Sequence, residues 1–244
     1  VCAGASKGSR ERGGHEQGVD DTHSVLKRAC AELQLSAVPD KLPCRERERE
    51  QIYQFLESAI RRGGLGCALY VSGMPGTGKT ATVKEVVRSL HEQHESGRLP
   101  PFQFVEINGM KLTHPYHAYT ALWKALTGKH AAPSRAAQML EQRFSSQASR
   151  RQCVVVLADE LDFLVTRKQS VLYNLFEWPT RKHSRLVVVG VANTMDLPER
   201  LLPRIHSRVG MGRIVFEPYT REQIQTIVRQ RVGALGAFDP RAVE

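Results

Sequence analysis

The sequence predicts an α/β domain in which a parallel sheet is covered by helices on both faces. Short apolar segments alternate along the chain with segments whose apolar residues recur at helical spacing. Those apolar segments are unbroken rather than alternating, as in Cys-Val-Val-Val-Leu at 153–157. A glycine-rich loop at 73–78 also joins an apolar segment to a helical one. Because parallel strands joined by helices are buried on both faces, they are typically continuous apolar runs.

Five apolar segments are predicted strands, namely residues 67–72, 102–107, 153–160, 185–193 and 213–218. Helical spacing of apolar residues predicts helices between and after them, around 52–60, from 79, around 119–126, and over 134–146, 169–178, 198–203 and 220–232. Pro179 is expected to stop the helix before it. The alternation therefore predicts one parallel sheet with helical connections.

Charge and composition restrict the class of partner. The 244 residues carry a formal net charge of +10, and the excess lies after residue 37, where 30 Lys and Arg face 20 Asp and Glu. Such an excess favours a polyanion, either a nucleic acid or a nucleotide. No apolar run approaches the ~20 residues of a membrane helix, so no membrane partner is expected. Residues 1–22 are poor in apolar side chains and are predicted to be disordered, whereas 23–35 have the spacing of a short helix.

A phosphate-binding loop is the strongest motif in the chain. The segment Gly-Met-Pro-Gly-Thr-Gly-Lys-Thr at 73–80 matches the pattern GxxxxGK[ST] and lies between a predicted strand and a predicted helix. Backbone N–H groups of such a loop surround phosphates, the lysine contacts the terminal phosphates and the last hydroxyl binds Mg²⁺. The predicted ligands of the nucleotide here are Gly73, Pro75, Gly76, Thr77, Gly78, Lys79, Thr80 and Ala81. The alternative is a glycine turn without a ligand.

Two carboxylates end the predicted strand at 153–160. Asp159 is expected to hold Mg²⁺ together with Thr80 and Glu160, while Glu160 orients the attacking water. A glutamate beside the aspartate favours hydrolysis over transfer of phosphate to a small molecule, which is the kinase alternative.

Polar residues also follow the next predicted strand. Asn193 ends that strand, where its amide is expected to contact the γ-phosphate and the water; the alternative is an asparagine chosen for the turn. Lys79, Glu160 and Asn193 are thus the predicted catalytic residues. Arg204 and Arg208 precede the last strand. Arg208 is the favoured candidate for an arginine finger that contacts the ATP of a neighbouring subunit, and the other arginine would be structural or touch DNA; the alternative for either is an ordinary surface arginine.

Several of these segments resemble one family. GMPGTGKT, VVVLADE, VGVANTMDLPERLLPR and HSRVG are similar to the motif series of AAA+ ATPases. LPCRE, EINGMKLT, YNLFEWPT and FEPYT are similar, more narrowly, to the subunit 1 family of the eukaryotic origin recognition complex. The resemblance extends over about residues 37–238.

The resemblance implies a P-loop AAA+ base domain with a five-stranded parallel sheet at 37–238. Residues 1–36 would then be a disordered or partly helical tail, and 239–244 the start of a helical lid that is mostly missing. ATP with Mg²⁺ is the implied ligand, and its adenine would be walled by Val38, Leu42, Pro43, Arg45 and Tyr219.

The same resemblance implies a nuclear DNA replication initiator that helps to load the replicative helicase. Its implied partners are the other subunits of the complex, especially subunit 4, which supplies an arginine for hydrolysis, the helicase-licensing factor, and duplex DNA. The segment 110–127 would lie against DNA, with Lys111, Lys124 and Lys129 as phosphate contacts, although a solvated helix face is the alternative for each lysine. Two further alternatives are the paralogous licensing factor and a nucleotide-binding scaffold without turnover.

Overall fold

The computed structural model describes residues 43–64, 66–147, 151–194 and 212–233. These residues belong to two units, one of which is formed by residues 45–219. The other contains, among the described residues, 43–44 and 220–233. The predicted tail and its short helix, and the helix predicted at 198–203, lie outside the described residues.

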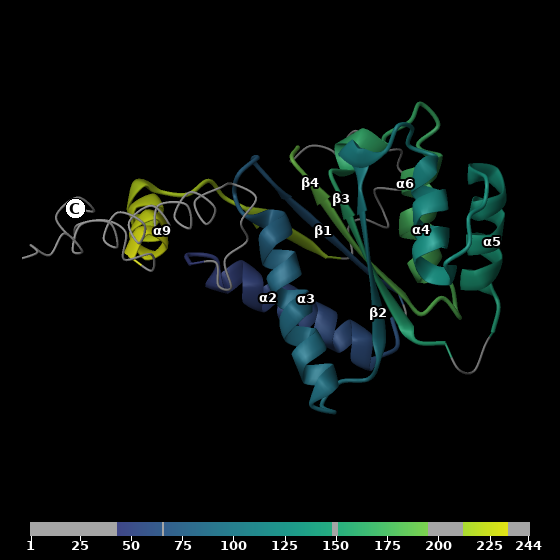
Figure 1. Cartoon of the computed structure of the whole chain (residues 1–244), viewed down its shortest axis with the longest axis horizontal. Coiled ribbons are helices and arrows are strands. Elements are labelled where there is room, and N and C mark those ends of the chain that lie inside the picture. Colours follow the sequence, from purple (N-terminus) through teal and green to yellow (C-terminus); the bar gives the residue numbers. More distant parts are fainter. Residues whose placement is uncertain (1–42, 65, 148–150, 195–211, 234–244) are drawn as a thin grey trace, which may run out of the picture. The chain divides into compact units, whose positions relative to one another are not determined.

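A single parallel sheet forms the centre of the 45–219 unit (Figure 1). Its strand order is β2-β3-β4-β1-β5. The strands are β1 (Cys67–Gly73), β2 (Phe102–Asn108), β3 (Cys153–Asp159), β4 (Leu186–Ala192) and β5 (Arg213–Phe216). The predicted fold class, with five parallel strands, is therefore confirmed, and each strand lies within about two residues of its predicted ends.

Helices cover both faces of this sheet, as predicted. Figure 1 shows α2 (Glu46–Arg61) and α3 (Lys79–Glu95) on one side, and α4 (His117–Thr127), α5 (Pro133–Ser145) and α6 (Ser170–Glu177) on the other. A hydrophobic core lies on each face of the sheet, and alternate residues of β4 point into one core or the other. Val187, Val189 and Val191 pack with α2 and α3, whereas Leu186, Val188 and Ala192 pack with α4 to α6. Every residue of β3 and β4 is buried, which explains why both strands are continuously apolar.

Three 3-10 helices, which the apolar spacing did not predict, adjoin these elements. They are η1 (Gly109–Lys111), η2 (Leu161–Leu164) and η3 (Trp178–Thr180). The helix α6 ends before Pro179, as expected, and the chain tightens into η3. η1 and η2 directly follow β2 and β3, apart from Glu160, so they shape the edge where the strands end.

Trp178 connects the helices on one face. Its side chain is fully buried, and its ring lies 5.7 Å from that of Tyr119 in α4 and 5.4 Å from that of Phe144 in α5. The indole N–H donates a hydrogen bond of 2.6 Å to a carboxylate oxygen of Glu141. Burial of a large ring with its one donor satisfied makes Trp178 a main packing residue of this core.

The remaining described helix, α9 (Arg221–Gly233), begins with a reciprocal cap. The Thr220 hydroxyl accepts a hydrogen bond from the N–H of Gln223 at 3.3 Å, and the Gln223 side chain accepts one from the N–H of Thr220 at 2.9 Å. This exchange satisfies two N–H groups that a helix start otherwise leaves without partners.

Replacement of Trp178 by alanine is expected to lower the free energy of unfolding by about 3–5 kcal/mol, because it leaves a cavity beside Tyr119 and Phe144. Urea titration measures this loss. Trp123→Ala is the matched control and should cost clearly less, since Trp123 is only partly buried and its indole N–H has no hydrogen-bond partner. Equal losses in the two variants would contradict the central role of Trp178.

Candidate nucleotide site

The loop between β1 and α3 has the shape of a phosphate cradle. Gly76 and Gly78 have φ angles of 78° and 86°, which favour glycine, and Gly78 is the N-cap of α3. The Thr77 hydroxyl donates to the carbonyl of Met74 at 2.8 Å and holds the turn. Because the first N–H groups of a helix have no partners within it, the start of α3 offers donors and a partial positive charge to an anion.

Gly73 is required by the close approach of β5. A Cβ at this position would lie 2.4 Å from the carbonyl oxygen of Phe216. Any other residue would push β5 away from the point where β1 enters the loop. This glycine therefore belongs to the sheet as much as to the phosphate-binding motif.

Lys79 lies within the loop that it follows. Its side chain is buried, and its ammonium donates to the carbonyls of Gly73 at 2.9 Å and Met74 at 2.8 Å. Burial lowers the pKa of Lys79, while the nearby carboxylates of Glu160, Asp159 and Asp162 raise it. The third N–H of the ammonium remains for a further acceptor such as a phosphate oxygen.

Asp159 joins three segments at the end of β3. One oxygen of its carboxylate accepts from the Thr80 hydroxyl at 3.0 Å and from the N–H of Glu160 at 3.1 Å. The other accepts from the side-chain amide of Asn108, at the end of β2, at 3.3 Å. Sequence reasoning did not assign Asn108 to the site, although it directly follows the strand predicted at 102–107 and ends the observed β2.

Hydroxyl and carboxylate oxygens are ligands that Mg²⁺ prefers. The Thr80 hydroxyl and Asp159 carboxylate are already adjacent, so this pair fits the ion. Within the described parts of the chain, no group of three or more His, Cys, Asp or Glu side chains is arranged to hold a metal alone. The donor set therefore suits Mg²⁺ bound jointly with phosphate oxygens, as is usual for this ion.

Glu160 contacts the end of the neighbouring strand. Its backbone is in the left-handed region, with φ at 54°, and its carboxylate accepts a 2.5 Å hydrogen bond from the side-chain amide of Asn193. Burial raises the pKa of Glu160, and Asp159 and Asp162 raise it further, against the opposing effects of Lys79 and Asn193. A higher pKa makes the carboxylate a better acceptor of a proton from water.

Arg45 fastens the loop to the far edge of the sheet. Its buried guanidinium donates to the carbonyl of Thr77 at 3.1 Å and to that of Glu217 at 2.5 Å. It also lies 4.0 Å from the centre of the Tyr219 ring and 5.2 Å from that of Phe216. The described contacts of Arg45 are with protein groups that hold the loop and the Tyr219 ring, and its predicted contact with adenine stays a prediction.

Tyr219 itself lies against the loop. A Cβ at Gly78 would come within 2.9 Å of the Tyr219 hydroxyl, so the ring occupies the flank of the cradle. Of the other predicted adenine contacts, Pro43 is described but belongs to the other unit, and Val38 and Leu42 lie outside the described residues, as do Arg204 and Arg208.

The predicted DNA contacts are all on the surface. Lys111 in η1, Lys124 in α4 and Lys129 just after α4 are exposed, so their charges are accessible. Tyr119, in α4, packs in the core: its hydroxyl donates to the carbonyl of Ser170 at 3.1 Å and accepts from the side-chain amide of Asn174 at 2.8 Å. Burial accordingly raises its pKa.

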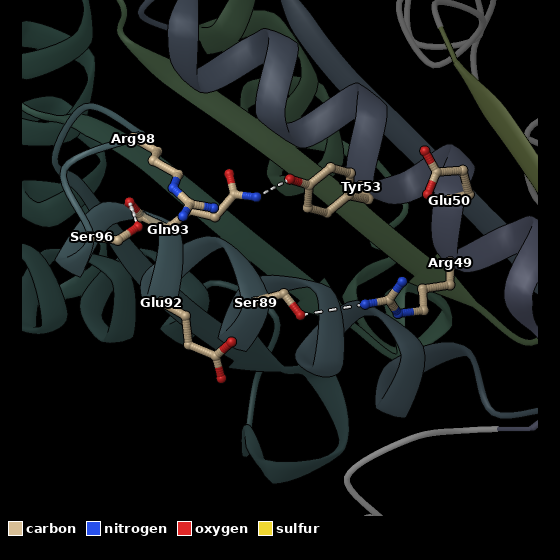
Figure 2. A pocket seen from close by; sticks show the side chains of 8 residues that line it. All are labelled: Arg49, Glu50, Tyr53, Ser89, Glu92, Gln93, Ser96 and Arg98. Atoms are coloured by element: carbon tan, nitrogen blue, oxygen red, sulfur yellow. Dashed lines mark hydrogen bonds between the residues drawn. The ribbon is translucent and has the colours of Figure 1, made fainter.

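A hollow of about 510 Å³ lies apart from this cradle, between α2 and α3 (Figure 2). Figure 2 shows Arg49 directed toward Ser89, and Gln93 toward Tyr53, across the two helices. Arg49 also forms a 2.9 Å ion pair with Glu85. The lining mixes both charges and contains no part of the phosphate-binding loop, so its contacts serve the packing of the two helices.

Among the described residues, no helix combines the length and apolar character needed to cross a membrane.

Comparison with known proteins gives concordant results. A sequence model of the ATPase family associated with various cellular activities (AAA) matches residues 69–213. Origin recognition complex subunit 1 of Cricetulus griseus is 49% identical over 232 residues, which are 95% of this chain and 27% of that protein. The chain thus spans about a quarter of the length of the curated relatives it matches.

Two solved structures are also similar. A chain of Drosophila ORC bound to DNA aligns with a TM-score of 0.80 and 45% identity, covering 99% of this chain and 58% of that one. The Aeropyrum pernix ORC1 protein in complex with DNA aligns with a TM-score of 0.66 and 26% identity, covering 82% of this chain and 52% of that one. The predicted resemblance to origin recognition complex subunit 1 is confirmed. Since the family model covers more than half of its length, including the phosphate-binding loop and both carboxylates, the chain belongs to the AAA family of ATPases.

Proposed function

We propose that this chain is the nucleotide-binding part of an origin recognition complex subunit 1, a DNA replication initiator that binds and hydrolyses ATP. Identity of about half over nearly the whole chain supports the subunit. The observation that supports turnover, rather than binding alone, is the hydrogen bond between Asn193 and Glu160 beside the Thr80–Asp159 pair. A scaffold that only binds nucleotide requires the phosphate-binding loop. It does not require the Glu160 carboxylate to be oriented by Asn193 of the neighbouring strand.

Binding of ATP depends on the loop and the start of α3. Their N–H groups and the Lys79 ammonium neutralise phosphate charge, and Arg45 keeps Thr77 in place through its carbonyl. Thr80 and Asp159 would hold Mg²⁺, which neutralises charge on the β- and γ-phosphates when it is bound. The ring of Tyr219, whose hydroxyl lies beside Gly78, would wall one side of the nucleotide.

Hydrolysis depends on Glu160 and Asn193. Glu160 orients the attacking water and accepts its proton, helped by the raised pKa of its carboxylate. Asn193 holds that carboxylate and donates its remaining amide hydrogen toward the reacting phosphate. An arginine from subunit 4 of the complex completes the site from outside, and the predicted role of Arg208 toward a nucleotide stays a prediction.

The proposed setting is the nuclear origin recognition complex. Structures similar to this chain are described as ORC bound to DNA, and others, at fold-level similarity only, as ORC with DNA and Cdc6. We therefore include the other subunits, duplex DNA and the licensing factor among the partners, with loading of the replicative helicase as the result.

The domain boundaries, with a tail at 1–36, the base domain at 37–238 and the start of a lid at 239–244, remain predictions. Lys111, Lys124 and Lys129 are the proposed phosphate contacts, since all three are exposed near the η1–α4 segment.

Lys79→Ala is expected to weaken binding of ATP with Mg²⁺ by about tenfold to a hundredfold, the usual contribution of a charged hydrogen bond. Titration with a fluorescent ATP analogue measures the Kd. Lys84→Ala, on the same helix and paired with Glu106, is the matched control and should bind normally. Unchanged affinity in Lys79→Ala would remove the basis for a nucleotide site in this loop.

Glu160→Gln is expected to bind ATP normally but to reduce turnover by about 10²–10⁴-fold, because the amide cannot accept the proton of the water. The assay is phosphate release by the reconstituted complex that carries the full-length variant. Glu95→Gln, exposed at the end of α3, serves as control. Turnover equal to that of the wild type would favour a scaffold whose nucleotide is not hydrolysed.

The affinity for duplex DNA should depend less steeply on salt when three lysines, Lys111, Lys124 and Lys129, are all replaced by alanine. We expect the slope of the logarithm of the binding constant against the logarithm of salt concentration to decrease in magnitude by about three, one for each lost phosphate contact. The measurement is DNA binding by the reconstituted complex over a range of salt concentrations. Lys182→Ala, an exposed lysine after η3, is the control. An unaltered slope would assign the three lysines to a solvated face.

A further inference from the structure

Asp162 occupies the short 3-10 helix η2, two residues after Glu160. Leu161 and Leu164 of this helix are buried, and they anchor it against the core. The N–H of Phe163 donates to the carbonyl of Glu160 at 3.1 Å, which closes the turn. The turn therefore holds Asp162 in a fixed relation to Glu160, with its carboxylate directed toward the end of β4.

The Asp162 carboxylate binds both residues that follow β4. One oxygen accepts from the backbone N–H of Asn193 at 2.9 Å, and the other accepts from the Thr194 hydroxyl at 2.5 Å. The carbonyl of Thr194 accepts in turn from the hydroxyl of Tyr70 in β1 at 3.0 Å. These hydrogen bonds tie η2, which follows β3, to the end of β4 and to Tyr70 in the middle of β1.

Asn193 depends on this tie because it lies beyond the sheet. β4 ends at Ala192, and the register of β4 with β1 ends there as well. The ladder that fixes a strand residue therefore no longer fixes Asn193, and Asp162 supplies the partner of its N–H. The Asn193 side chain then returns to Glu160, so that Glu160, Asp162 and Asn193 form a closed ring of covalent and hydrogen bonds.

From this ring we infer that Asp162 is a positioning residue for ATP hydrolysis, which holds Asn193 where its amide can orient Glu160. The inference rests on the proposed ATPase function. The hydrogen bonds given for the Asp162 carboxylate go to Asn193 and Thr194 rather than to Glu160, so we assign its effect on hydrolysis to the placement of Asn193. A displacement of about 1 Å in such a group can reduce a rate by about a hundredfold, so a residue of this kind affects turnover much more than binding.

The hydrogen bonds that hold the phosphate-binding loop do not involve Asp162. Lys79 is held by the carbonyls of Gly73 and Met74, and Thr80 by Asp159. Asp162→Ala is therefore expected to lower kcat about tenfold to a hundredfold and to leave the Kd for ATP within about threefold. Asp162→Asn, which keeps an acceptor for the N–H of Asn193, should fall between the wild type and Asp162→Ala.

A double-mutant cycle separates positioning from general stability. In the reconstituted complex with the full-length chain, Asp162→Ala combined with Asn193→Ala should turn over ATP no more slowly than Asn193→Ala alone. Glu95→Ala is the control for loss of an exposed carboxylate. Multiplied losses in the double variant, a parallel loss of ATP affinity and melting temperature, or full activity in Asp162→Ala would each overturn the inference.

Amide hydrogen exchange supplies a readout that does not require turnover. Asp162→Ala should speed exchange at Asn193 at least about tenfold, since that N–H loses its acceptor, while exchange within β3 stays as in the wild type. An unchanged exchange rate at Asn193 would contradict the hydrogen bond between its N–H and Asp162, and with it the inference. If instead turnover by the complex proved independent of Lys79, the proposed ATPase function would fail, and the exchange result would still test the contact between Asp162 and Asn193.

Discussion

The parallel alignment of β3, β4 and β1 is the constraint on which the candidate site depends. Parallel strands end at the same edge of a sheet, so residues that follow them meet there however far apart they lie in the chain. Asp159 and Glu160 follow β3, Asn193 follows β4, and the phosphate-binding loop follows β1. β2 brings Asn108 to the same edge from the other side of β3. The hydrogen bonds that join these groups exist because the strand order makes them neighbours.

Concentrating charge at this edge is unfavourable unless each group has a partner. Burial shifts the pKa of Lys79 downward and that of Glu160 upward, so both groups are pushed toward their neutral forms. The attraction between the ammonium and the carboxylates opposes both shifts and keeps the charged forms accessible. Glu160 also holds a left-handed backbone, a conformation that costs of order 1–3 kcal/mol and that surrounding contacts must maintain. Glu160, the residue proposed to activate water, thus has both a strained backbone conformation and a raised pKa.

The shape of the loop depends on groups outside its motif. Arg45, at the start of α2, holds Thr77 and the chain after β5 simultaneously. β5 in turn approaches Gly73 so closely that only glycine fits. The phosphate cradle is therefore fixed by the start of α2 and by β5, both outside the motif in sequence, and changes in either would be transmitted to the loop.

The sequence by itself determined the fold class and the three segments that carry the candidate chemistry, because each of these is a local pattern. A glycine-rich loop between a strand and a helix, an apolar run that ends in Asp159-Glu160, and a second run that ends at Asn193 are all contiguous. Asn108, Asp162 and the contacts of Arg45 were decided only in the tertiary structure. Each is a single polar residue whose partner lies many positions away, such as Asp159 for Asn108, Asn193 for Asp162 and Glu217 for Arg45. In the sequence such residues are indistinguishable from those of ordinary turns and helix starts, and only the pairing of strands gives them their partners.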